Sequence, residues 1–179
     1  MRTITDWLNI TFPFEGTDAA LRDLLPRIWI ELTPKLGNLT DRNKGLHGFQ
    51  RSLAFDNGGA MFAYGGQNGK AYLSLPGEAC ALIRDWGCAY GFCKSLGVTI
   101  TRWDGAVDDF SGGHSVDEAM ALYLSGALGT HGKKPKMRQA GNWMEPDGSG
   151  RTLYIGKREN GKMLRVYEKG KQLGEQTNK

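Results

Sequence analysis

Two short segments of the chain hold residue types that could carry out chemistry. The segment RTLYIGKRENGKMLRVYEKGK places Tyr154 and Tyr167 among Lys and Arg side chains, and the segment TRWDGAVDD holds Asp104 and Asp108. Cations beside a phenol favour its phenolate form, which can attack phosphorus. Carboxylate oxygens are ligands for hard cations such as Mg²⁺ or Mn²⁺. The two segments are therefore a candidate nucleophile and a candidate metal site.

The acidic segment has the alternation of a β-strand. Residues two or four apart lie on the same strand face, so Arg102, Asp104 and Asp108 share one face. The two carboxylates would stand roughly 13 Å apart by strand rise, too far to chelate one ion unless the strand bends, and Gly105 is the expected place for a bend. Asp108 and Asp109 lie at the expected strand end, where a hard cation could take oxygen ligands. The alternative is structural: Asp104 pairs with Arg102 or another basic residue, and Asp108 and Asp109 only end the strand.

The basic segment is expected to form a hairpin. Alternation along its second strand places Arg165, Tyr167 and Lys169 on one face and turns Leu164 toward the core. Tyr154, on the first strand, is either a core tyrosine of an edge strand or a platform on which a base stacks. The alternative for both tyrosines is a half-buried sheet position with a solvated hydroxyl group.

Charge is distributed unevenly along the chain. Residues 1–129 hold 11 Lys or Arg against 14 Asp or Glu, whereas residues 130–179 hold 12 against 5. Cations interleaved with phenols are typical of a surface that binds a polyanion, although a basic segment can equally be an ordinary solvated surface.

Composition limits the class of protein. The 179 residues are 40% hydrophobic, enough for a core without disulfide or metal staples. Cys80, Cys88 and Cys93 match neither a zinc spacing nor an even-numbered disulfide framework, so buried reduced thiols are expected. No apolar run approaches the length of about 18 residues that suggests a membrane span, and no signal-peptide pattern is present, so we expect a soluble cytoplasmic protein.

The order of elements predicts an α+β fold. Strand-like alternation occurs over residues 4–14, 48–55, 60–66, 70–77, 98–110, 151–157 and 162–170, and helical spacing over 17–32, 77–96 and 115–128. Residues 129–141 are expected to be a loop. Tight turns between the strands indicate a mainly antiparallel sheet with helices packed on one face. We expect one domain, 1–179, whose sheet contains both the strand over 98–110 and the hairpin.

The segments LNITF, TRWDGAVDD and GRTLYIGKRENGKMLRVYEKGK follow an order that resembles the trans-acting replication initiator family. That family includes rolling-circle plasmid initiators, replication initiation factors of filamentous phages and related conjugative relaxases. Its pattern of T-hydrophobic-Y-hydrophobic-G-S-R-x-S followed by R-hydrophobic-Y-D/N-K is similar to TLYIGKRENGKMLRVYEK here. The resemblance extends from about residue 4 to 171 and is strong only in the last two segments.

The resemblance implies a fold similar to rolling-circle initiator nicking domains and a site-specific strand transferase. In the family a tyrosine attacks a phosphodiester of the replication origin, forms a 5′-phosphotyrosyl link and leaves a 3′-hydroxyl primer. The matching nucleophile is Tyr167, with Asp104 and Asp108 as ligands of Mg²⁺ or Mn²⁺. The implied partners are origin DNA, single-stranded or in a hairpin, and a host helicase and polymerase.

Several cations complete the expected site. Arg165 and Lys169 are assigned to catalysis, and Arg158 is a further candidate to neutralise the phosphate. The residues expected to contact DNA are Arg102, Lys133, Lys134, Lys136, Arg138, Tyr154, Lys157, Arg158 and Lys171.

The chain departs from the family pattern in three places. GKREN replaces GSR-x-S, Glu168 stands where the family has Asp or Asn, and a later strand with Arg and glutamates is missing, so we expect a chain truncated at its C-terminal end. The competing function is a regulator that binds single-stranded DNA or RNA without chemistry. Such a module has no use for the acidic pair, which favours the enzyme.

Overall fold

The computed structural model describes residues 2–129, 132–144 and 148–172. The chain divides into two compact units, Met1–Asp108 and Asp109–Lys179, and each is described by itself. Within the described ranges, no helix is both long and apolar enough to cross a membrane.

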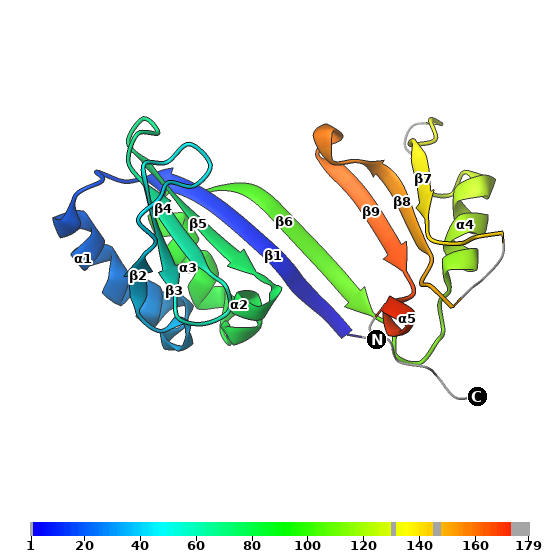
Figure 1. The fold of residues 1–179 in the computed structure, drawn as a ribbon, viewed down its shortest axis with the longest axis horizontal. Helices are drawn as coiled ribbons and strands as arrows, with labels where there is room; N and C mark the ends of the chain where they lie inside the picture. Colours follow the sequence, from blue (N-terminus) through cyan, green and yellow to red (C-terminus); the bar gives the residue numbers. More distant parts are fainter. Residues whose placement is uncertain (1, 130–131, 145–147, 173–179) are drawn as a thin grey trace. The chain divides into compact units, whose positions relative to one another are not determined.

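The first unit is built on a six-stranded antiparallel sheet (Figure 1). Its strand order is β2-β3-β4-β5-β1-β6. The strands are β1 (Arg2–Pro13), β2 (Leu39–Asp41), β3 (Arg51–Phe55), β4 (Met61–Tyr64), β5 (Lys70–Pro76) and β6 (Thr99–Asp108). The predicted meander over residues 48–77 is therefore present as β3, β4 and β5.

Helices cover one face of this sheet, as the sequence predicted (Figure 1). They are α1 (Asp18–Arg27), a π-helical turn (Ile28–Leu32), a 3₁₀ turn (Pro34–Leu36), α2 (Gly77–Leu82) and α3 (Trp86–Ser95). Thr17 caps α1, because its hydroxyl oxygen accepts a hydrogen bond from the backbone of Ala20 at 3.1 Å. Alternate residues of β1, namely Leu8, Ile10 and Phe12, are buried against these helices.

The helix predicted over residues 77–96 is divided in two. The backbone of Ile83 is extended, which ends α2, and Asp85 caps α3. One carboxylate oxygen of Asp85 accepts hydrogen bonds from the backbone of Gly87 at 2.8 Å and of Cys88 at 3.0 Å. Because an Asp at this position stabilises a new helix start, the apolar spacing continues across a break in the helix.

The three cysteines are free thiols, but only one matches the expectation of burial. Cys80 is buried, Cys93 is half-buried and Cys88 is exposed. Burial raises the pKa of the Cys80 thiol to about 11. The prediction of buried thiols is therefore wrong for Cys88.

The pair β1 and β6 forms the edge of the six-stranded sheet that carries the acidic segment. The pairing of β1 and β6 has two register shifts. Asp6 of β1 is skipped between the pairs Thr5↔Gly105 and Trp7↔Asp104, and Thr101 of β6 is skipped between Asn9↔Arg102 and Ile10↔Ile100. The first shift lies at Gly105, where the sequence predicted a bend. Gly105 also leaves room for the Trp103 ring. A Cβ atom added at residue 105 would lie 2.8 Å from that ring and would clash with it.

The second unit is a three-stranded antiparallel sheet covered by one helix (Figure 1). Its elements are α4 (Val116–Ser125), β7 (Met137–Ala140), β8 (Thr152–Lys157), a 3₁₀ turn (Arg158–Asn160), β9 (Lys162–Tyr167) and α5 (Lys169–Gln172). The strand order is β7-β8-β9, which makes β8 the central strand. The predicted cap of α4 is confirmed, since the Ser115 hydroxyl oxygen accepts from the backbone of Glu118 at 3.0 Å.

The core of the second unit lies between α4 and one face of β8. Leu153 and Ile155 are buried against Val116 and Ala119, and Val166 packs at the margin of this cluster. Strand alternation therefore turns Tyr154 to the opposite face.

The α+β class with an antiparallel sheet and helices on one side is confirmed. The prediction that the strand over 98–110 and the hairpin share one sheet is wrong, because β6 ends the six-stranded sheet and the hairpin belongs to the second sheet. Residues 137–140, predicted as loop, form β7. Their sequence MRQA shows no apolar alternation, and pairing with β8 makes them a strand.

The core assignment predicts different costs for two leucines on neighbouring strands. Leu153→Ala should lower the free energy of unfolding of the second unit by about 3 kcal/mol, because a fully buried side chain leaves a cavity. Leu164→Ala is the matched control, since Leu164 is 47% exposed and its loss should cost about 1 kcal/mol or less. Hydrogen exchange of the β8 backbone amides measures both values. Equal costs would contradict the assignment.

Candidate functional site

A row of alternating cations and phenols crosses the open face of the second sheet. Arg138 on β7 lies opposite Tyr154 on β8, and Tyr154 lies opposite Arg165 on β9. Arg138 and Arg165 are exposed and Tyr154 is half-buried. Leu153 and Ile155 face the core, so Tyr154 between them faces the other side of the sheet. The residues paired with Tyr154 on β7 and β9 face that side too.

The side chains of this row are in contact. The guanidinium carbon of Arg138 lies 4.3 Å from the centre of the Tyr154 ring, and that of Arg165 lies 5.8 Å from the same ring. Arg165 also lies 4.3 Å from the centre of the Tyr167 ring. These distances are within the range of cation–π attraction. Arg165 therefore contacts both tyrosines.

Tyr167 is the last residue of β9 and lies opposite Thr152. The prediction that Arg165 and Tyr167 share a strand face agrees with their spacing in β9 and with their contact. The same prediction for Lys169 is wrong, because the strand ends at Tyr167 and Lys169 begins α5. Alternation cannot place a residue beyond the end of its strand.

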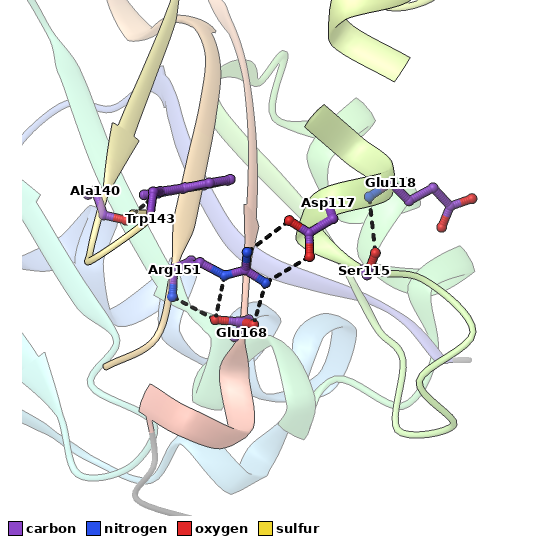
Figure 2. Close-up of polar contacts among 7 residues, drawn as sticks. All are labelled: Ser115, Asp117, Glu118, Ala140, Trp143, Arg151 and Glu168. Atoms are coloured by element: carbon purple, nitrogen blue, oxygen red, sulfur yellow. Dashed lines mark hydrogen bonds and ion pairs between the residues drawn. The ribbon is translucent and has the colours of Figure 1, made fainter. Parts of the chain in front are cut away.

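The chain beyond Tyr167 is anchored by an arginine that the sequence analysis did not single out (Figure 2). The backbone N–H of Arg151 donates to the Glu168 carboxylate at 2.8 Å, and the Glu168 N–H donates to the Arg151 carbonyl at 3.1 Å. The guanidinium donates to the same carboxylate at 3.0 Å from Nη2. These bonds continue the pairing of β8 and β9 one residue past Tyr167.

Arg151 also connects α4 to the end of the hairpin, as Figure 2 shows. Its Nη1 and Nη2 donate to the two carboxylate oxygens of Asp117 at 2.8 and 2.9 Å, and its guanidinium lies 5.3 Å from the Trp143 ring centre. Asp117 and then Glu168 raise the pKa of the Arg151 guanidinium above its usual range. The sequence signal was the acidic residue at Glu168, which was noted only as a departure from the family pattern.

In the first unit, the acidic segment forms a separate polar cluster. The guanidinium of Arg102 lies 4.2 Å from the Trp7 ring centre, and its Nε donates to the Asp104 carboxylate at 3.0 Å. Nη2 of Arg102 donates to the same carboxylate, and the Trp7 indole N–H donates to Asn9 at 2.6 Å. Asp104 raises the pKa of Arg102. The structural alternative for Asp104, a pair with Arg102, is therefore the observed arrangement.

The described residues do not fit the predicted metal centre. No three His, Cys, Asp or Glu side chains in this part of the chain come together as a group that could hold a metal ion. Asp104 is engaged by Arg102, and Asp108 lies four residues further along an extended strand, roughly 13 Å away by rise. Asp109 organises the next turn, where its carboxylate accepts from the backbone of Ser111 at 3.0 Å and of His114 at 2.8 Å.

The other cations predicted to contact DNA are placed as follows. Lys133 and Lys136 are exposed, whereas the ammonium of Lys134 donates to the Leu124 carbonyl at 2.5 Å near the end of α4. Lys157 and Arg158 are exposed at the turn of the hairpin. The side chain of Lys171 lies outside the described part of the chain.

The assignment of Arg158 to the phosphate at Tyr167 does not fit the hairpin register. Lys157 pairs with Lys162 at the turn, and Tyr167 is five residues further along β9, roughly 17 Å away by rise. Arg158 is therefore at the opposite end of the hairpin from Tyr167. The convergence of Tyr167 with Asp104 and Asp108 stays a prediction, since these residues belong to different units.

Comparisons with known proteins find two similarities. Residues 98–179 match the family model described as replication initiation factor. The chain is similar to the structure of a rolling-circle replication initiator protein from Geobacillus stearothermophilus, with 25% identity and a TM-score of 0.72, over 99% of this chain and 70% of that chain. A search of curated proteins finds no match. The two matches confirm the resemblance to replication initiators that the sequence predicted.

The Arg151 network predicts that the end of the hairpin depends on one carboxylate. Glu168→Gln should lower the opening free energy of the β8 and β9 amides by about 1–2 kcal/mol, because a largely buried guanidinium loses a charged acceptor. Glu159→Gln, at an exposed turn position, is the control and should have almost no effect. Hydrogen exchange measures both. A Glu168→Gln variant with the protection of the parent protein would show that the network does not hold this end.

The turn after β6 should depend on pH in acid. Hydrogen bonds from Ser111, and further ones from the His114 backbone, lower the pKa of Asp109 from 3.8 to about 2. Because the folded-state pKa is depressed, the stabilisation is complete above about pH 4 and is lost as the pH falls through about 2. The chemical shift of the His114 amide should report this midpoint, and Ser111→Ala should move it upward. A midpoint near 3.8 in the parent protein would contradict the bonding.

Proposed function

Because residues 98–179 match the replication initiation factor family and the whole chain shares the fold of a rolling-circle initiator, we propose that this protein nicks and rejoins one strand of origin DNA. In this proposal Tyr167 is the nucleophile and Arg165 its cationic neighbour. The reaction class is a transesterification in which one phosphodiester replaces another.

The contact between Arg165 and Tyr167 is the observation that carries the proposal. A half-buried phenol lies on an open sheet face with a guanidinium 4.3 Å from its ring centre. Among the described residues, the ion pairs include no carboxylate partner for Arg165. A guanidinium matches the geometry and charge of a phosphate, so a DNA phosphate bound by Arg165 would lie beside the phenol oxygen.

The proposed step balances without any oxidant or reductant. The Tyr167 oxygen attacks phosphorus, the bond from phosphorus to the 3′ oxygen breaks, and a 5′-phosphotyrosyl link remains. The phenol proton passes to solvent, and the 3′ oxygen takes up a proton to become a hydroxyl group. Rejoining is the reverse reaction, with a 3′-hydroxyl attacking the phosphotyrosine. In this proposal Arg165 stabilises the charge on the non-bridging oxygens.

Arg151 and Glu168 contribute through position. They extend the pairing of the hairpin beyond Tyr167, and this limits the motion of the backbone that carries the phenol. A well-defined phenol position favours in-line attack, because small displacements of a reacting group lower the rate strongly.

The described residues do not fit the predicted Mg²⁺ or Mn²⁺ site at Asp104 and Asp108. The proposed step is carried by Tyr167 and Arg165. The metal requirement expected from the sequence remains a separate prediction, and chelation in the adduct assay tests it.

We propose that residues 1–179 act as one replication-initiator nuclease domain in the cytoplasm of a bacterial host. The proposed partners are origin DNA and the host helicase and polymerase that would use the new 3′-hydroxyl. The basic charge of residues 130–179 supports a DNA partner, because phosphate contacts dominate the affinity of proteins for nucleic acids.

The proposal predicts that one phenol is esterified. Incubation with labelled single-stranded origin DNA should give a covalent adduct on a denaturing gel, and Tyr167→Phe should abolish it. Binding should stay within about threefold, because only the attacking oxygen is lost. Tyr154→Phe is the matched control on the same sheet face and should still form the adduct. Addition of a chelator and then of Mn²⁺ measures the metal requirement in the same gel.

Two outcomes would contradict the assignment. If Tyr154→Phe abolishes the adduct and Tyr167→Phe does not, then the nucleophile is the other phenol. If the parent protein binds the strand at every tested metal concentration and forms no adduct, then the protein is the binding regulator that was the competing function.

A further inference from the structure

The position of Tyr154 between two arginines limits what its ring can bind. Strands β7 and β9 flank β8 on opposite sides, so Arg138 and Arg165 approach the ring of Tyr154 from opposite sides. Their guanidinium carbons lie 4.3 and 5.8 Å from the ring centre. The ring therefore has a cation on the side of each neighbouring strand. A base that stacked on Tyr154 would have to displace one of them, which weakens the expectation that this ring is a stacking platform.

The same geometry gives the two arginines a fixed spacing. Neighbouring strands are about 4.8 Å apart, so side chains in register on β7 and β9 stand about 10 Å apart across the row. Both arginines are exposed. In the described part of the chain, the ion pairs found include neither arginine. The row therefore presents two separate positive charges on one open face.

We propose that Arg138 and Arg165 bind two phosphates of one DNA single strand and that Tyr154 is the positioning residue that holds both guanidinium groups. This inference rests on the proposed function, in which Arg165 binds the scissile phosphate beside Tyr167. Arg138 then binds a neighbouring phosphate on the far side of Tyr154. The single-stranded DNA therefore crosses the sheet along the row, between β9 and β7.

Charge complementarity identifies the ligand as a nucleic-acid backbone. Guanidinium groups bind phosphate oxygens through paired N–H donors, and cation–π contacts keep their planes in place beforehand. A positioned arginine loses less side-chain entropy when it binds, so the ring of Tyr154 raises affinity without touching DNA. A single strand is the favoured form, because an unpaired backbone can bend to follow two charges on one sheet face.

Salt dependence counts the phosphate contacts, and coupling between two variants separates positioning from base stacking. Each phosphate contact with a single strand contributes about 0.7 to the slope of log affinity against log salt, whereas stacking and positioning contribute factors that salt changes little. A positioning ring acts through the arginines that it holds, so its effect shrinks when one of them is removed, whereas a stacking ring acts without them.

The experiment uses fluorescence anisotropy with a labelled oligo(dT) strand and the full chain carrying Tyr167→Phe. This background keeps the aromatic ring beside Arg165 and excludes covalent attachment, so the result does not depend on nicking. Arg138→Gln should lower the magnitude of the slope by about 0.7, because one phosphate contact is lost. Tyr154→Leu should weaken binding at all salt concentrations, and its effect should be smaller when Arg138→Gln is already present, because the ring then holds one arginine fewer. Tyr154→Phe, which keeps the ring, should bind like the parent protein.

Matched controls separate this row from general charge. Arg22→Gln removes an exposed arginine from α1 and should leave the slope unchanged. A hairpin duplex of equal charge is the second ligand, and Tyr154→Leu should affect its binding less than that of the single strand. Hydrogen exchange of the β8 amides checks that Tyr154→Leu is folded. Should it fail to fold, the slope of Arg138→Gln decides.

Three results would overturn the proposal. An effect of Tyr154→Leu that is as large with Arg138→Gln as without it would show that the ring stacks a base. An unchanged slope in Arg138→Gln would show that this arginine does not contact phosphate. A larger effect on the duplex than on the single strand would assign the row to double-stranded DNA. A missing adduct together with the expected slopes would refute nicking and leave the phosphate row standing.

Discussion

The alternation of the central strand β8 is the constraint from which the candidate site follows. Leu153 and Ile155 must be buried under α4, because they supply the largest part of a small core. Strand geometry then leaves Tyr154 on the opposite face, and the antiparallel register brings Arg138 and Arg165 to either side of it. A slip of one residue in either pairing would turn those cations toward the core, so packing and the charged face depend on the same register.

The Arg151 network holds the end of the hairpin in place. Tyr167 lies at the end of β9, where a strand would normally fray, and the next residues turn into α5. Arg151 places one guanidinium between Glu168 and Asp117, so the end of β9 and the first turn of α4 are held by the same group. An ion network of this kind adds little net stability over apolar packing, but the loss of one partner is costly. Its value here is a defined position for the phenol.

In the first unit, a similar combination of an arginine, a carboxylate and an aromatic ring has a different consequence. Arg102 is held between Trp7 and Asp104, so the carboxylate that resembled a metal ligand already has a cationic partner. To coordinate a divalent ion, Asp104 would have to release the guanidinium that binds the same oxygens. The cluster orients Arg102 on the face of the sheet that the helices leave uncovered.

The amino-acid sequence by itself determined the local features. Apolar periodicity predicted most strands and helices, Thr17 and Ser115 predicted two helix starts, and the motif around Tyr167 predicted the resemblance to replication initiators. These depend on contacts between residues close in sequence. Tertiary structure alone decided that β6 and the hairpin lie in different sheets, that MRQA becomes a strand and that Arg151 holds Glu168 and Asp117. Pairing partners and ion pairs between residues far apart in sequence depend on which surfaces meet in the fold, and no local pattern records that choice.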